Sequence, residues 1–192
     1  MSLSIPIIYC SVRQNRSGIN AVKFLEQQIK ELGHKPIIVD PSEYALPLLD
    51  KTYKEFEPGT APESMQKVAD IFAKADAFVV VSAEYNHAIP PALTNLMNHY
   101  FDEYAWKPSG IVTYSSGGFG GVRPLSQLRT FLAELGCSSI PHTMPIPKIK
   151  DAFDSSGKAL DENYIRRSHK FLNHLFWYAE ALRTQKEKGI PQ

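Results

Sequence analysis

Residues 6–10 read PIIYC, a short and almost continuous apolar run. Such a run is typical of a strand that is buried on both faces of a parallel sheet. After a polar stretch, apolar residues recur at helical spacing from Ile19 to Leu32, and Gly33 stands where a helix C-terminal cap is expected. A second apolar run follows at residues 36–40. The first forty residues therefore predict a compact β-α-β unit.

The same alternation continues along the chain. Residues 41–62 contain prolines and a glycine without a sustained period, and they indicate a long connection. The pattern beyond them predicts a helix ending at Asp76, a strand at 77–81, a helical face from Ala92 to Tyr100, a strand at 110–114, a helix over 125–135 closed by Gly136, a strand beginning near Ser139 and a last helix over 164–182. Five strands joined by right-handed crossovers imply an α/β, doubly wound parallel sheet with helices on both faces. The order 2-1-3-4-5 is one of two common solutions.

The composition favours one folded domain over residues 1–192. A chain of 192 residues can bury a core that is covered on both faces, but it is short for two independent domains. Its 43% hydrophobic and 21% charged residues are an ordinary globular balance. The formal net charge of +1 predicts no global attraction to nucleic acid or to an anionic membrane surface.

Cysteine usage and hydropathy point to a cytoplasmic protein. Cys10 and Cys137 show no paired spacing, so a disulfide framework is not expected. No apolar run approaches membrane-spanning length, and the N-terminus lacks the pattern of a secretory signal. The histidines are scattered, and neither cysteine has one nearby in the sequence, so neither a metal site nor a nucleophilic triad is predicted.

Three loops of unusual composition follow the first, third and fourth strands, at residues 11–18, 82–91 and 114–121. Ligands of open α/β sheets bind outside the carboxyl ends of the strands, at the point where the strand order reverses. Because these three strands are neighbours in the predicted order, their loops can surround one ligand.

The first loop, SVRQNRSG, has the chemistry of a phosphate site. Ser11 and Ser17 offer hydroxyl donors. Arg13 and Arg16 offer forked positive charge, and Gly18 brings the loop to a helix N-terminus, where unpaired N–H groups attract anions. The alternative is that Ser17 only caps the helix while both arginines are solvated.

The second loop, SAEYNHAIPP, exposes polar and aromatic groups directly after the most hydrophobic strand. Its candidate groups are Glu84, Tyr85, Asn86 and His87. A flat heteroaromatic ring needs hydrogen-bonding groups at its edge and an aromatic or imidazole wall. The alternative is that Tyr85 is a core aromatic residue and His87 an ordinary hydrogen-bonded loop residue.

The third loop, YSSGGFGG, places four glycines and two serines between a strand and a helix, beginning with Tyr114, Ser115, Ser116 and Gly117. Glycine removes side chains where a backbone must touch a ligand, or permits positive φ. A flexible turn is the alternative, since a glycine-rich loop alone is weak evidence. The convergence of all three loops favours a ligand site.

At these residues the chain resembles the NADPH-dependent FMN reductase family, which has a flavodoxin-like fold and includes quinone, chromate and azo-compound reductases. The resemblance covers most of residues 5–140 and lies in SVRQNR at 11–16, LPLLD at 46–50, EYNH at 84–87 with residues 90–95, and residues 114–121 with Arg123. Two departures are Cys10, where the family has glycine, and Thr94, where it has lysine.

The resemblance implies a role for each loop. Ser11, Arg13, Arg16, Ser17 and Gly18 would hold the FMN phosphate; Glu84, Tyr85, Asn86 and His87 would line the isoalloxazine; and Tyr114, Ser115, Ser116 and Gly117 would close its opposite side. The implied activity is transfer of hydride from NADPH or NADH through FMN to a small acceptor such as a quinone, free flavin, azo compound or metal oxyanion. The flavin carries this chemistry, so no catalytic side chain is required.

The alternative function is a flavodoxin-like electron carrier or an FMN-binding sensor without nicotinamide turnover. The near-neutral charge argues against a carrier, because electron-carrying flavodoxins are typically acidic.

We also expect a homodimer, or a dimer of dimers, with the flavin near the subunit boundary. The region from Leu93 to Trp106 holds more large apolar groups than one helix face buries easily. The alternative is that Phe101, Tyr104 and Trp106 pack under the loop after the second strand.

Overall fold

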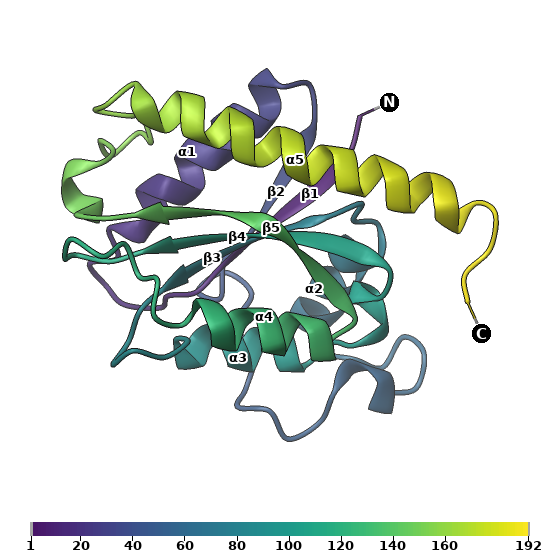
Figure 1. The fold of residues 1–192 in the computed structure, drawn as a ribbon. Helices are drawn as coiled ribbons and strands as arrows, with labels where there is room; N and C mark the ends of the chain where they lie inside the picture. The colour runs from purple at the N-terminus through teal and green to yellow at the C-terminus, as the bar shows by residue number, and fades with distance from the viewer. Residues whose placement is uncertain (1, 192) are drawn as a thin grey trace.

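The computed structural model describes residues 2–191 and contains a five-stranded parallel sheet in the order β2-β1-β3-β4-β5 (Figure 1). The elements are β1 Ser4–Tyr9, α1 Gly18–Glu31, β2 Lys35–Val39, α2 Glu63–Ala73, β3 Phe78–Ala83, α3 Pro91–Asn98, β4 Lys107–Tyr114, α4 Leu125–Glu134, β5 Cys137–Ile146 and α5 Asn163–Lys186. Short 3-10 turns lie at Tyr53–Glu55, Asp102–Tyr104 and Ile149–Asp151. The predicted fold class and strand order are confirmed.

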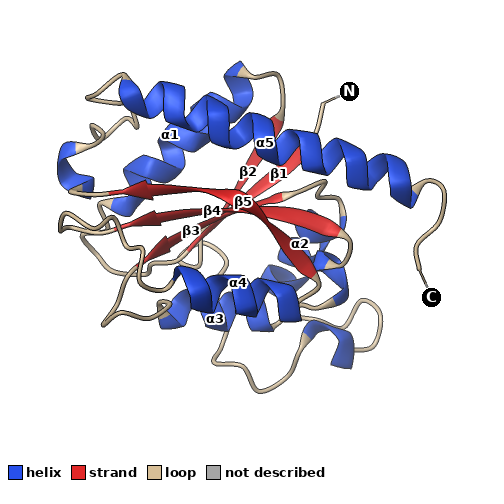
Figure 2. Cartoon of the chain, viewed as in Figure 1, coloured by secondary structure: helices blue, strands red, loops and turns tan. Residues whose placement is uncertain are grey.

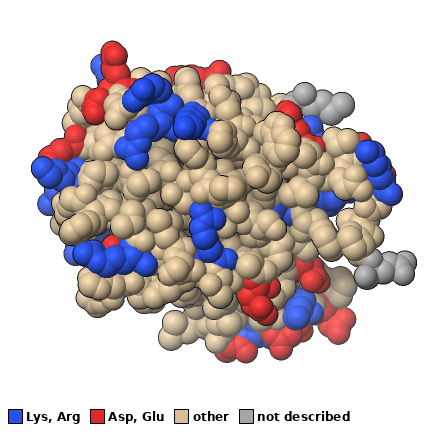
Figure 3. Space-filling model, viewed as in Figure 1, with Lys and Arg blue, Asp and Glu red and all other residues tan. Residues whose placement is uncertain are grey.

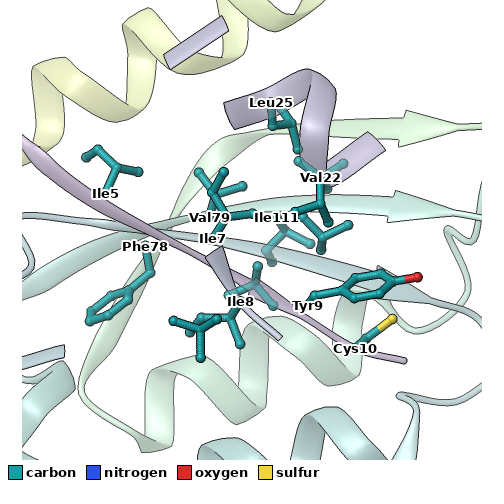
Figure 4. Close-up of a cluster of buried hydrophobic side chains, with 14 of the residues drawn as sticks. Ile5, Ile7, Ile8, Tyr9, Cys10, Val22, Leu25, Phe78, Val79 and Ile111 are labelled. Carbon is teal, nitrogen blue, oxygen red and sulfur yellow. The ribbon is translucent and has the colours of Figure 1, made fainter. Parts of the chain in front are cut away.

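Helices cover both faces of the sheet. Figure 2 shows α1 and α5 on one face and α2, α3 and α4 on the other. The central strands β3 and β4 are buried along their whole length, as the apolar run at residues 77–81 predicts for β3. In Figure 4, Val22 and Leu25 of α1 lie on one side of β1, and Ile8 points to the opposite side. The hydrophobic core therefore has two layers, and the loops at the strand ends are left free to form a site.

Element boundaries differ from the prediction at the end of α5, which runs to Lys186 rather than to residue 182, and at the start of β4. This strand begins at Lys107, three residues before the predicted Gly110, because a charged residue and a proline mask its start. The structure accommodates Lys107 by turning its ammonium onto three carbonyl oxygens, at 2.6 Å from Phe72, 2.9 Å from Ala73 and 2.9 Å from Glu103. These hydrogen bonds cap the end of α2 and permit a buried lysine.

The aromatic residues after α3 do not continue that helix. It ends at Asn98, and the hydroxyls of Tyr100 and Tyr104 donate to the carbonyl oxygens of Met65 (3.0 Å) and Met97 (3.2 Å). Both tyrosines are fully buried within the chain. The apolar surplus that predicted a subunit interface is therefore largely absorbed by the core.

Within residues 2–191, no helix combines the length and the hydrophobicity needed to cross a membrane. The same residues contain no cluster of three or more His, Cys, Asp or Glu side chains suited to a metal ion. Cys10 and Cys137 are both buried free thiols.

Candidate active site

A cleft of about 400 Å³ lies where the loops after β1, β3 and β4 meet. Its lining residues are Ser11, Arg13, Asn15, Arg16, Ser17, Ala83, Glu84, Tyr85, Tyr114, Ser115, Ser116, Ile149 and Lys150. Nine of them are residues predicted from the sequence, drawn from all three loops. The topology thus brings the three loops to one place, as the strand order requires.

Four predicted residues stand outside the lining. Gly18 lies beneath the cleft, where a Cβ would collide with the ring of Tyr114. Asn86 and His87 form the tip of a turn. The carbonyl oxygen of Gly117 accepts hydrogen bonds from Lys148 N and Ser115 Oγ, both at 3.0 Å. These four residues shape the loops rather than the walls of the cleft.

Ile149 and Lys150, which follow β5, were missed by sequence reasoning. Ser115 N donates to Ile146 O at 3.2 Å, and Ile149 N donates to Ser115 O at 3.0 Å. These bonds attach the segment after β5 to the serine-glycine loop after β4. The only available signal was the predicted adjacency of the two strands, which places their following loops side by side.

In the first loop, the two arginines have different surroundings. Arg16 Nη1 donates to Ser11 O (2.9 Å), Asp40 Oδ1 (2.5 Å) and Ser42 Oγ (2.9 Å). Arg16 therefore fastens the loop to the end of β2, where the carboxylate of Asp40 is almost fully buried. Arg13 is exposed, and its guanidinium carbon lies 6.0 Å from the ring centre of Tyr85.

Ser17 is the N-cap residue of α1, but its side chain makes no capping hydrogen bond. The interpretation that Ser17 merely caps the helix is therefore not supported by the geometry. Its hydroxyl and the first-turn N–H groups of α1 stand at the positive end of the helix dipole, beside the guanidinium groups of the loop. This end of the cleft is suited to an anion.

Beneath the cleft, Tyr9, Cys10 and Tyr114 form a buried hydrogen-bonded cluster. Tyr114 Oη donates to Tyr9 Oη at 3.2 Å and lies 3.4 Å from Cys10 Sγ. Ala83 N donates to the same sulfur at 3.0 Å. Burial raises the pKa of Cys10 to about 11, and it raises the pKa values of both tyrosines further. The floor is therefore uncharged at neutral pH, and the Cys10 side chain packs below the cleft rather than in it.

The second loop contains a tight two-residue turn. Tyr85 and Ala88 exchange backbone hydrogen bonds of 3.1 and 2.9 Å, while Asn86 (φ 51°) and His87 (φ 65°) both adopt left-handed conformations. Two consecutive positive φ values are the pattern of a type I′ turn. Non-glycine residues in this region carry backbone strain, which is common at functional sites. The turn holds Glu84 and Tyr85 against the cleft, where Tyr85 Oη lies 3.1 Å from Ser11 Oγ.

Glu84 has a buried carboxylate with one oxygen unpaired. Its side chain is 7% exposed, and its Oε1 accepts a hydrogen bond from Arg123 Nη1 at 2.7 Å. Oε2 is buried and has no hydrogen-bond partner among the described residues. A buried acceptor without a donor is costly, so this oxygen indicates a ligand group with an N–H or O–H. The guanidinium carbon of Arg123 also lies 4.6 Å from the ring centre of Phe119. Arg123 belongs to the family resemblance, but it was not among the predicted site residues.

The glycines of the third loop have two distinct uses. A Cβ at Gly117 or Gly118 would meet no atom within 4 Å, so these positions leave open space beside the cleft. Gly121 has φ 73°, and a Cβ there would lie 2.5 Å from Tyr114 O. Gly121 is thus required by the turn, whereas Gly117 and Gly118 leave room for a ligand.

Fold and cleft geometry together define a flavodoxin-like protein with a polar cleft at a helix end that is suited to an anion. The family model described as NADPH-dependent FMN reductase matches residues 3–151, and the chain belongs to this family. The protein is accordingly a flavin-dependent oxidoreductase that uses FMN, with NAD(P)H as co-substrate. This membership favours a reductase over the alternative of an electron carrier or sensor.

Similar proteins agree with this assignment. The chain is 29% identical over 135 residues to a quinone reductase of Pseudomonas putida, covering 64% of this chain and 72% of the relative. It is 26% identical over 200 aligned positions to a 2-hydroxy-1,4-benzoquinone reductase of Burkholderia sp., covering 97% of this chain and all of the relative. Its fold matches that of the flavoenzyme NAD(P)H:acceptor oxidoreductase FerB of Paracoccus denitrificans with a TM-score of 0.73 at 18% identity, over 93% and 98% of the two chains.

Proposed function

We propose that this protein binds FMN in the cleft described above and passes hydride from NAD(P)H to a quinone or another small acceptor. The observation that best supports this proposal is that one cleft joins the N-terminus of α1 to Glu84, whose buried Oε2 has no hydrogen-bond partner among the described residues. An FMN molecule has an anionic phosphate at one end and a ring with a polar N–H edge at the other. The quinone-reducing relatives support the acceptor class.

At the phosphate end, Ser11, Arg13 and Ser17 would donate to the phosphate at the positive end of the α1 dipole, while the N–H groups of Ile19 and Asn20 already donate to Arg16 O and Ser17 O. Arg16 would act through its ion pair with Asp40, which holds the loop in place.

At the ring end, Glu84 Oε2 would accept a hydrogen bond from the flavin, and Tyr85 would form one wall. Ser115 and Ser116 would close the other side through the backbone, next to the space beside Gly117. Asn86 and His87 would keep the turn rigid. Bound FMN would supply the hydride-transfer chemistry, and the residues of the cleft would bind and orient it.

The decisive experiment combines anaerobic spectroscopy with steady-state kinetics. Protein loaded with FMN should lose its visible flavin absorbance on addition of NADPH or NADH and regain it on addition of a quinone. Initial rates with varied NADPH and quinone should give parallel double-reciprocal lines, because NADP⁺ leaves before the quinone binds. Flavin that stays oxidised under excess NADPH and NADH would support the carrier or sensor instead.

The role of Arg13 can be tested separately from that of Arg16. Replacing Arg13 with Ala should weaken FMN binding by about 1.5–3 kcal/mol, the usual range for a hydrogen bond to a charged group. Riboflavin, which lacks the phosphate, should bind both proteins equally. Fluorescence titration measures both affinities, and an unchanged FMN affinity would mean that Arg13 is only a solvated side chain.

We further infer that residues 1–192 form a single domain, and that the protein is a cytoplasmic homodimer or dimer of dimers with no nucleic-acid partner. Two exposed apolar side chains lie in loops that line the cleft: Val12, 57% exposed, and Phe119, 67% exposed. A partner subunit resting on this rim would shield them and lie close to the flavin.

A further inference from the structure

A second cavity, of about 310 Å³, lies between β5 and the first half of α5. It is lined by His142, Thr143 and Met144 of the strand and by Arg166, Arg167 and Lys170 of the helix. None of the six side chains is a carboxylate. Neither the flavin chemistry nor the loops of the cleft account for this arrangement.

The three cations of this cavity are electrostatically uncompensated. Within residues 2–191, Arg166, Arg167 and Lys170 form no ion pair with a carboxylate. Asp161 and Glu162 precede the helix, but its first turn holds no acidic residue. In Figure 3, Lys and Arg side chains gather over the first half of α5.

Their position on the helix is also unfavourable. A cation in the first turn of a helix opposes the positive end of the dipole, and Arg166 is the fourth residue of α5. Like charges four residues apart, as in Arg166 and Lys170, repel each other. A solvated helix face would place lysine and arginine toward the other end, as α5 does with Arg183 and Lys186. A local arrangement that costs stability beside a cavity points to a binding role.

Two of the guanidinium groups are held in place. Arg167 Nη2 donates to Pro145 O at 2.5 Å, and its guanidinium carbon lies 5.3 Å from the ring centre of Tyr164. Arg166 Nη2 donates to Asn163 Oδ1 at 2.8 Å. A guanidinium held by a backbone hydrogen bond and a ring contact, as in Arg167, loses little freedom when it binds a phosphate. Arg166 is exposed and has one hydrogen bond, and both side chains retain further N–H donors.

His142 adds a neutral donor to the cavity. Its ring centre lies 4.9 Å from that of His174. Burial, together with the nearby charges of Lys170 and His174, lowers the pKa of His142 below its usual value. At neutral pH the ring therefore offers an N–H without adding to the repulsion between the cations.

The basic cavity and the flavin cleft share one stretch of chain. Thr143 and Met144 line the cavity, whereas Ile149 and Lys150 line the cleft. Between them, Ile146 O accepts the hydrogen bond from Ser115 N. The cavity and the cleft are therefore lined by neighbouring parts of β5 and of the segment that follows it.

We propose that the cavity between β5 and α5 binds a phosphate monoester. Fixed guanidinium groups and a lysine are the groups that recognise phosphate, and a volume of about 310 Å³ leaves room for part of an attached organic body. Two kinds of molecule carry such a phosphate. One is the 2′-phosphate of NADPH, which would make the cavity select NADPH over NADH. The other is a separate phosphorylated metabolite.

The test compares wild-type protein with Arg166→Gln/Lys170→Gln, both loaded with FMN. Calorimetric titration with inorganic phosphate, adenosine 2′-monophosphate, NADP⁺ and NAD⁺ measures the affinities. The double variant should bind adenosine 2′-monophosphate about tenfold or more weakly, because charge-assisted hydrogen bonds are lost. A parallel loss for NADP⁺ but not NAD⁺ would identify the co-substrate as the source. Unchanged NADP⁺ affinity, together with weakened binding of the two simpler phosphates, would identify a separate metabolite.

A matched control is Lys186→Gln/Lys188→Gln, which also removes two positive charges, but at the C-terminal end of α5 and just beyond it. This control should retain wild-type affinities. Without phosphate, the Arg166→Gln/Lys170→Gln variant should melt at or above the wild-type temperature, since repulsion is relieved. Added phosphate should raise the melting temperature of the wild type but not of this variant. Unchanged affinity of this variant for all four compounds would overturn the proposal, whatever the flavin activity.

Discussion

The carboxylate of Glu84 presents an acceptor where the flavin ring edge is proposed to lie. In Glu84→Gln the amide oxygen can keep the hydrogen bond to Arg123, which places an N–H₂ donor where Oε2 was. A donor facing a ligand N–H loses the hydrogen bond, so FMN binding should weaken by about 1.5–3 kcal/mol. Fluorescence titration measures this loss.

The control for Glu84 is Arg123→Gln, which keeps the carboxylate but removes its partner. This change should lower the free energy of unfolding, because it leaves a buried charge uncompensated. Equal FMN affinity in Glu84→Gln and wild-type protein would contradict the proposed contact.

Cys10 is predicted to make stability depend on alkaline pH. Burial raises the pKa of its thiol from 9.0 to about 11. Between these values the unfolded chain loses the proton while the folded protein keeps it. The contribution of the thiol to the free energy of unfolding is therefore complete below pH 9. It falls by about 1.4 kcal/mol per pH unit between pH 9 and pH 11. Urea unfolding of wild type and Cys10→Ser across this range measures it.

The comparison with Cys10→Ser cancels the contributions of all other titrating groups, since serine does not ionise there. The hydroxyl can still accept from Ala83 N. A stability difference between the two proteins that stays constant from pH 9 to pH 11 would show that the thiol is more hydrated than its burial implies.

At the scale of elements, Lys107 joins the start of β4 to the end of α2. Replacing it with Met keeps the apolar stem but leaves the carbonyl oxygens of Phe72, Ala73 and Glu103 without this donor. Unfolding free energy should fall by about 1–3 kcal/mol. Lys186→Met, at an exposed position of α5, should change it by less than about 0.5 kcal/mol. Chemical denaturation distinguishes the two, and equal effects would show that the Lys107 cap contributes little.

At the scale of the whole molecule, the position of an interface matters for activity. Phe101 and Trp106 precede β4, whereas the cleft follows its last residue, Tyr114. An interface through Phe101 and Trp106 would lie at the end of the sheet where β4 begins, opposite the end that carries the cleft. The rim residue Phe119 is therefore the better candidate for contact with a partner subunit.

Light scattering at micromolar concentration should show a dimer for wild-type protein and a larger monomer fraction for Phe119→Ser. Trp177→Ser, at a similarly exposed site on α5, is the control and should leave the dimer intact. A monomer with full turnover in the wild type would contradict the proposed arrangement. Dissociation by the control rather than by Phe119→Ser would place the interface on α5.

The sequence alone was sufficient for five parallel strands and for the three loops at the carboxyl edge. Its patterns allowed two common strand orders, and the predicted order 2-1-3-4-5 is the one found. Apolar runs such as residues 6–10 and 77–81 depend only on local spacing and burial. Residues 11–18 and 114–121 contrast sharply with the strands before them. The parallel crossover rule then leaves few ways to arrange five strands, so local patterns were enough to predict the fold and the edge that bears the site.

The tertiary structure alone decided which polar groups pair. Arg16 is bound to Asp40, 24 residues away, and Glu84 to Arg123, 39 residues away, so neither pair is visible as a local motif. Tyr100 and Tyr104 turn inward after α3 ends, and Ile149 reaches the cleft from β5. These outcomes depend on strand register and on side-chain direction across separate crossovers, which local spacing does not encode. That is why the sequence located the candidate site, whereas the fold determined which of its side chains pair within the protein and which stay without a partner among the described residues.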